Sequence, residues 1–282
     1  MREGTITLFS KIKYPAVAVL LFGVLLLTTF PNRQKELERL TYPVVIMGDS
    51  IMGQSRGETS VSNQLGDILN VPVYNGAFGG TCMAVQPADN CDYTTDLMNM
   101  VGLSIAIATD DFGIQQTARS RRDITDYYEP VVDEMECVDF SKVEIVVLAF
   151  GINDYHGGIP LDNAENPNDV YTYAGAVRTV VKNLRTRYPD MRIILATPTY
   201  AWYRSNHLTC EEYVTGDYFL KDYVQQEIEL GEELGIEVVD LYTNVYPHEK
   251  WEDMEVYTED GIHPNEAGRR LLAEILAERI MQ

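Results

Sequence analysis

Short apolar runs alternate with amphipathic stretches along most of this chain. Five of the runs have the length of β-strands: residues 44–47, 71–74, 145–148, 193–196 and 236–239. The first, third and fourth are almost continuously apolar, which is typical of central strands covered on both faces of a sheet. Strands that alternate with amphipathic segments of helical length predict an α/β fold with a parallel sheet of about five strands.

Two amphipathic stretches have the spacing of helices packed on such a sheet. Between residues 170 and 184 apolar side chains recur every three or four positions, with basic residues such as Arg178 on the other face. A similar pattern at residues 271–276, beyond Pro264, predicts a final covering helix. Residues 82–140 have no clear period, and two interpretations stay open: helical insertions near the mouth of an active site, or a merely structural crossover.

The first 30 residues follow a different pattern. Residues 16–30 form an uncharged apolar run preceded by Arg2, Lys11 and Lys13. The run suits the apolar core of a signal peptide, and it is slightly short for a membrane-spanning helix. No convincing small-x-small cleavage site follows it, so we expect an anchor that is retained, with cleavage and secretion as the alternative.

This pattern divides the chain into three parts. We expect a cytoplasmic tail with the membrane anchor or signal segment at residues 1–31, a linker at 32–41, and a single domain at 42–282. Because basic residues flank the apolar run on both sides, the positive-inside rule gives no orientation. We place the domain outside the cytoplasm by analogy with other short-tailed N-terminal signal segments.

Composition and charge narrow the partners of this domain. Hydrophobic residues make up 45% and charged residues 23%, as in an ordinary globular protein. The formal net charge is −21, and the basic residues of the N-terminal segment leave the rest even more acidic. Such a surface repels phosphate backbones, so we expect no nucleic-acid partner and favour a neutral ester or sugar as ligand.

The four cysteines give a weak indication of compartment. Cys82 and Cys91 are close enough in sequence to close a small loop, while Cys137 and Cys210 either pair or stay as buried thiols. Plain core cysteines are an equally good reading. Their spacing does not suit a metal site, so no metal is expected.

Residues able to do chemistry follow the predicted strands directly. Ser50 comes after the first, the glycine-rich residues 75–81 after the second, and Asn153 after the third. Asp260 and His263 follow the fifth after a loop. In open parallel sheets the ligand crevice lies at the carboxyl ends of the strands, so we expect these residues to converge.

The converging residue types suit acyl transfer. A serine hydroxyl becomes a good nucleophile when a histidine takes its proton and an acid orients that histidine, and Ser50, His263 and Asp260 supply these groups. The transition state also needs preset donors for the carbonyl oxygen. The backbone N–H groups of Ser50 and Gly80 and the side-chain amide of Asn153 are the predicted donors.

Four sequence blocks in this order resemble the SGNH hydrolases, also called GDSL-like lipases and acylhydrolases. The blocks are Gly-Asp-Ser at 48–50, the segment 75–80, Gly-Ile-Asn-Asp at 151–154 and Asp-Gly-Ile-His at 260–263. The resemblance covers about residues 43–280. It implies a flavodoxin-like three-layer α/β/α sandwich, no cofactor, and the roles just given to Ser50, Gly80, Asn153, Asp260 and His263. Gly76 and Gly79 are alternatives for the glycine donor.

Each of these residues also has a structural reading. Ser50 or its neighbour Asp49 is able to cap a helix, Asn153 or Asp154 to stabilise a turn, and Asp260 with His263 to form a helix-entry turn.

Aromatic and acidic residues near the expected crevice are further candidates. We name Asp154, Tyr200 and Trp202 as substrate-binding candidates, although the two aromatics are at least as well explained by packing of their loop onto the domain. His156, His207 and His248 have no partner pattern and are interpreted as surface or loop residues, unless His156 borders the substrate.

The sequence thus leads to a ranked set of functions. First is hydrolysis of small O-acyl esters, above all acetyl groups on carbohydrate, through an acyl-Ser50 intermediate. The alternatives are membrane-anchored O-acyl transfer to a glycan, acylhydrolase action on lipid esters, and a glycan-binding protein without turnover. The intact motifs argue against the last.

Overall fold

The computed structural model describes residues 39–86, 98–117, 128–243 and 245–282. A five-stranded parallel sheet lies at its centre, in the order β2-β1-β3-β4-β7. Its strands are β1 (Val44–Gly48), β2 (Val73–Asn75), β3 (Ile145–Ala149), β4 (Arg192–Ala196) and β7 (Glu237–Val239). These are the five predicted runs, and the parallel α/β fold is confirmed.

Burial along the strands follows the predicted difference between central and edge positions. All five residues of β1 are buried, as are the last four of β3 and of β4. The two strands with less apolar sequences, β2 and β7, lie at the edges and are only partly buried. Numbered consecutively, the strand order is that of flavodoxin-like sheets, with a switch point between β1 and β3.

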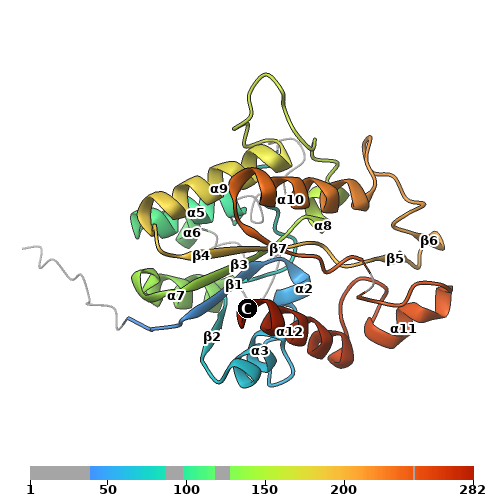
Figure 1. Ribbon diagram of the computed structural model, residues 1–282, viewed down its shortest axis with the longest axis horizontal. Coiled ribbons are helices and arrows are strands. Elements are labelled where there is room, and N and C mark those ends of the chain that lie inside the picture. Colours follow the sequence, from blue (N-terminus) through green and yellow to red (C-terminus); the bar gives the residue numbers. More distant parts are fainter. Residues whose placement is uncertain (1–38, 87–97, 118–127, 244) are drawn as a thin grey trace, which may run out of the picture. The chain divides into compact units, whose positions relative to one another are not determined.

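Helices cover both faces of the sheet (Figure 1). One layer contains α5 (Met100–Thr109), α9 (Tyr173–Arg187) and α10 (Leu220–Leu234), and the other contains α3 (Val61–Leu69) and α12 (Glu266–Ile280). A further helix of ten residues is α7 (Tyr128–Cys137). The remaining elements are short: α2 (Ser50–Gly53), α6 (Gly113–Gln116), η2 (Phe140–Lys142), α8 (Ile152–His156), the hairpin strands β5 (Trp202–Tyr203) and β6 (Leu208–Thr209), η3 (Trp251–Asp253) and α11 (Met254–Tyr257).

Polar caps fix where the two predicted helices begin. The Thr172 side chain accepts the Gly175 N–H and starts α9, three residues later than the apolar pattern suggested. Asn265 accepts the Gly268 N–H and starts α12, so Pro264 precedes the cap instead of lying in the first turn. Both helices end a few residues beyond the predicted stretches. The backbone hydrogen bonds of a helix can continue past its last apolar residue, so the apolar pattern does not fix the helix end.

Beyond the loop at residues 82–86, the described parts of the stretch 82–140 are largely helical, and their longest contact is structural. In α5, six of the ten residues are buried and the helix packs along α9. The Asn183 amide of α9 donates to Ser104 of α5 at 2.9 Å. This helix therefore belongs to the covering layer, which favours the structural reading for this part of the stretch.

The N-terminal predictions remain predictions. The expected anchor at residues 1–31 and most of the expected linker lie outside the described residues, as does Cys91. None of the helices within the described ranges has the length and apolarity that crossing a bilayer requires. The end of the linker belongs to the body, since Arg39 pairs with Asp110 and the Leu40 N–H donates to the Cys137 carbonyl at 2.8 Å.

The suggested pairing of Cys137 with Cys210 is absent, because both are free thiols. Cys210 is fully buried, and burial raises the pKa of its thiol to about 11. Of the two readings left open by the sequence, the buried thiol holds for Cys210.

Candidate active site

The predicted chemistry gathers at the carboxyl edge of the sheet, on either side of its switch point. Ser50 follows β1 as the first residue of α2, and Asn153 follows β3 in α8. The buried Asp49 caps α2 by accepting the Ile51 N–H at 2.9 Å. This cap holds the chain so that the Ser50 hydroxyl emerges where strand turns into helix.

Ser50, His263 and Asp260 form a continuous hydrogen-bonded chain. His263 Nε2 lies 2.9 Å from Ser50 Oγ across 213 residues of sequence, and His263 Nδ1 lies 2.7 Å from Asp260 Oδ2. The other oxygen of Asp260 accepts the backbone N–H groups of Ile262 and His263 at 2.9 and 2.8 Å. The carboxylate therefore fixes both the ring and the backbone that carries it.

The charge state of Asp260 suits this arrangement. Partial burial alone raises the pKa of its carboxyl, but the hydrogen bonds from His263 and Ile262 outweigh burial and hold the pKa below its ordinary value. Asp260 is thus ionised at neutral pH. An ionised acid on Nδ1 leaves Nε2 able to accept a proton from the serine.

Close packing against the β5–β6 hairpin sets the position of the Asp-Gly-Ile-His turn. The Trp202 N–H donates to the Gly261 carbonyl at 2.8 Å, and the Gly261 N–H donates to Thr258 Oγ1 at 3.0 Å. Gly261 has φ of 100°, and a Cβ there would lie 2.4 Å from the Trp202 carbonyl oxygen. Only glycine meets both requirements, so the turn needs Gly261.

The donors expected for a carbonyl oxygen lie on three adjacent segments. Ser50 is the first residue of a helix, so its N–H has no acceptor within that helix. Gly80 is exposed with φ of 79°, a conformation that favours glycine. Gly76 is unsuitable as the alternative donor because its N–H already donates to the Ile46 carbonyl at 2.8 Å.

Asn153 and Thr81 join two of these segments. Asn153 Nδ2 donates to the Thr81 carbonyl at 2.9 Å, which orients the amide and leaves its second N–H for a ligand. Thr81 Oγ1 in turn donates to the carbonyls of Phe78 and Gly48 at 2.9 and 3.2 Å. The sequence reading missed Thr81, although its place directly after the two glycines is a signal for a residue that holds their loop.

The structure gives Asp154 a different place from the expected contact with substrate. Its side chain is fully buried, and its two oxygens accept the N–H groups of Met83 and Ala84, both at 2.9 Å. Burial raises the pKa of Asp154 to about 7, against the lowering effect of these backbone hydrogen bonds. Asp154 thus stabilises the loop after Gly80 from inside the domain.

Tyr200 and Trp202 are not placed as substrate-binding side chains either. Each is 1% exposed, and their rings pack together with centroids 4.7 Å apart. The ring of His248 stacks on Tyr200 at 4.2 Å. A ring without exposed surface cannot stack on a substrate, so the structure favours the alternative that these aromatics pack their loop onto the domain.

The described rim of the site is open. The side chain of His263 is 26% exposed and that of Asp260 is 50% exposed.

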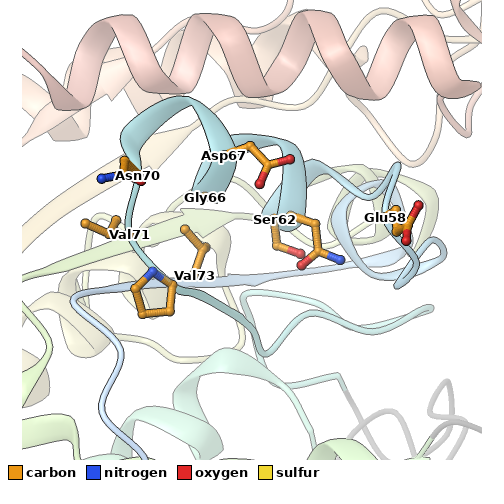
Figure 2. A pocket seen from close by; sticks show the side chains of 9 residues that line it. Glu58, Ser62, Gly66, Asp67, Asn70, Val71 and Val73 are labelled. Carbon is orange, nitrogen blue, oxygen red and sulfur yellow. The ribbon is translucent and has the colours of Figure 1, made fainter.

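A hollow of about 690 Å³ lies away from this site, between α3 and the start of β2, with Glu58, Asp67 and Asn70 at its wall (Figure 2). No group of three His, Cys, Asp or Glu side chains within the described ranges is arranged to hold a metal ion.

Fold and site together define a class of protein: a three-layer α/β/α sandwich with a serine, a histidine and an aspartate linked at the carboxyl edge of its sheet. Within that class the chain belongs to the GDSL-like lipase/acylhydrolase family, whose model matches residues 46–271. Among curated proteins no significant match was found.

Solved structures share the fold at low sequence identity. A protein from Lactobacillus plantarum is 16% identical, with a TM-score of 0.60, and the match covers 86% of this chain and 98% of that one. A possible lipase from Chitinophaga pinensis is 18% identical, with a TM-score of 0.54 and coverage of 85% and 97%. At such identities the likeness concerns the fold alone.

Proposed function

We propose that this protein is a serine esterase that hydrolyses small O-acyl esters, with acetyl esters of carbohydrates as its substrates. The observation that carries the proposal is the hydrogen-bonded chain from Ser50 Oγ through His263 to the ionised Asp260. Membership of an acylhydrolase family supports the reaction type. The acidic chain and the open rim support a neutral ester with a bulky alcohol portion.

The geometry suits a two-step mechanism. His263 Nε2 takes the proton of Ser50 as its Oγ attacks the ester carbonyl carbon, and the resulting oxyanion lies among the N–H groups of Ser50, Gly80 and Asn153. When the bond to the alcohol oxygen breaks, His263 returns the proton to that oxygen and Ser50 stays acylated. A water molecule, deprotonated by His263, then releases the carboxylic acid and regenerates the hydroxyl.

The length of the acyl chain tests the substrate part of this proposal. With the full-length protein, kcat/KM is expected to fall from p-nitrophenyl acetate to the butyrate and further to the octanoate. A fluorophosphonate should label Ser50 stoichiometrically, as read by peptide mass, whichever ester is preferred. A kcat/KM that rises with chain length would instead assign the protein to long acyl chains.

Replacing Asn153 by alanine tests the side-chain donor. Loss of one oxyanion donor typically lowers kcat by about 10²- to 10³-fold, with little change in KM. The alanine also frees the Thr81 carbonyl, so the Asn153→Asp protein is a useful companion: it keeps the side-chain size but replaces the donor by an acceptor. Steady-state kinetics on p-nitrophenyl acetate measures both. An unchanged kcat in both variants would remove Asn153 from the mechanism.

A further inference from the structure

A group of aromatic side chains stands beside the site without a part in the chemistry just described. His156 is the last residue of α8, three positions after Asn153, and its ring is exposed. Its Nε2 lies 3.0 Å from the hydroxyl of Tyr203, the last residue of β5. The Tyr203 ring contacts that of Tyr213 with centroids 4.8 Å apart. We call His156, Tyr203 and Tyr213 the aromatic ledge.

The ledge rests on a buried support. The fully buried Tyr155 ring lies under His156, with centroids 5.3 Å apart, and meets Tyr213 edge-on. Its hydroxyl donates to the Tyr213 carbonyl at 2.7 Å. Because the support holds His156 and Tyr213, the partly exposed rings of the ledge are already in place, and binding to them costs little side-chain entropy.

Two separate links place the ledge next to the reacting groups. On one side His156 and Asn153 share the single turn of α8. On the other, Tyr203 follows Trp202, whose N–H bonds the carbonyl of Gly261, two residues before His263. The ledge therefore borders the centre from both the oxyanion side and the histidine side.

The chemistry of the ledge is polar but uncharged. Although His156 is exposed, partial burial of its ring against Tyr155 and Tyr203, and then the charge of His263, lower its pKa to about 4, so the imidazole is neutral at neutral pH. Its Nδ1 has no partner among the described residues, while Nε2 is engaged with Tyr203. The ring faces of the ledge can pack against C–H groups of a ligand, and its hydrogen-bonding atoms without a partner can bind hydroxyl groups. A ligand with both kinds of group therefore suits the ledge.

We propose that the aromatic ledge is the subsite for the alcohol portion of the ester, and that it binds a sugar through its ring faces and hydroxyls. This rests on the proposed esterase function and gives it a specificity determinant. An apolar alcohol would cover the Nδ1 of His156 without giving it a hydrogen-bond partner, which is unfavourable.

Conservative variants test the subsite. Tyr203→Phe removes only the hydroxyl, and His156→Phe keeps an aromatic ring, slightly larger, while removing both ring nitrogens. Toward a monoacetylated methyl glucoside, each is expected to lower kcat/KM about fivefold, the usual effect of one lost hydrogen bond. Toward p-nitrophenyl acetate and octyl acetate, kcat/KM should stay within about twofold. Tyr42→Phe, on the chain just before β1 at the opposite end of the sheet, is the matched control.

Binding measured in the Ser50→Ala background separates the subsite from the chemistry. Titration of the full-length Ser50→Ala protein with the acetylated glucoside, followed by NMR, should give a Kd that either Phe substitution raises about fivefold. That result would support the ledge even if the wild type turned over no ester. Unchanged binding, equal losses on the sugar ester and on p-nitrophenyl acetate, or a larger loss on octyl acetate would overturn the proposal.

Discussion

The Ser50→Ala protein is expected to lose about 10⁴- to 10⁶-fold in kcat toward p-nitrophenyl acetate, because no other group can take the place of the attacking oxygen. The substitution removes a hydroxyl whose side-chain hydrogen bond is to His263 at 2.9 Å. Alanine is well tolerated in the first turn of a helix, and the cap of α2 comes from Asp49. The fold should therefore be unchanged, as thermal unfolding would show.

A companion variant sharpens this result. His263→Ala is expected to lose a similar factor, and the double variant little more, since residues that act as one unit give non-additive losses. Ser141→Ala is the control serine, in η2 at the start of β3 and so at the far end of the sheet from Ser50. Wild-type turnover in Ser50→Ala would mean that another group is the nucleophile.

Much of the fold could be predicted because its signals are local. Apolar runs set the strands, and the less apolar runs turned out to be the edges, β2 and β7. The helix α10 escaped notice because Glu227 occupies a buried position on its apolar face. Glu227 is hydrogen-bonded to the hydroxyl of Tyr173, 54 residues away in α9. A partner so distant in sequence cannot be recognised from the local pattern of α10.

The candidate site, like the fold, could be predicted only in part. The order of the four blocks suggested that Ser50, Asn153 and His263 converge, because parallel strands present their carboxyl ends at one edge. For Asp154 and Trp202 the sequence left a structural role and a substrate-binding role open, because burial decides between them. From sequence, an aspartate that follows a strand can be interpreted as a ligand or as a turn former. Only the tertiary structure shows that the two oxygens of Asp154 accept the N–H groups of Met83 and Ala84.

That arrangement makes Asp154→Asn an informative substitution. An asparagine side chain has one acceptor oxygen, so either the Met83 or the Ala84 N–H is left buried opposite an NH₂ group. An orphaned buried donor costs about 1–3 kcal/mol of unfolding free energy. The same loop contains Thr81, which holds the Asn153 amide, so kcat is expected to fall by about 10²-fold as that donor shifts.

The pH dependence of the stability loss identifies its cause. The folded-state pKa of Asp154 is raised to about 7, so between its ordinary value and 7 the folded protein binds a proton that the unfolded chain releases. The stability that this group gives the wild type therefore falls as the pH rises from the ordinary pKa of an aspartate to about 7 and levels off above that, whereas asparagine does not titrate. Denaturant unfolding should therefore show a larger loss of stability in Asp154→Asn at pH 6 than at pH 8.

Asp162→Asn is the control carboxylate for this measurement. The hydrogen bond from Arg178 lowers the pKa of Asp162, so it stays ionised from pH 6 to 8 and its loss should be constant over that range. A constant loss in Asp154→Asn as well would mean that burial does not hold a proton on Asp154. Unchanged stability and kcat would mean that the loop after Gly80 does not depend on this carboxyl, and that the oxyanion donors are held by Asn153 and Thr81 alone.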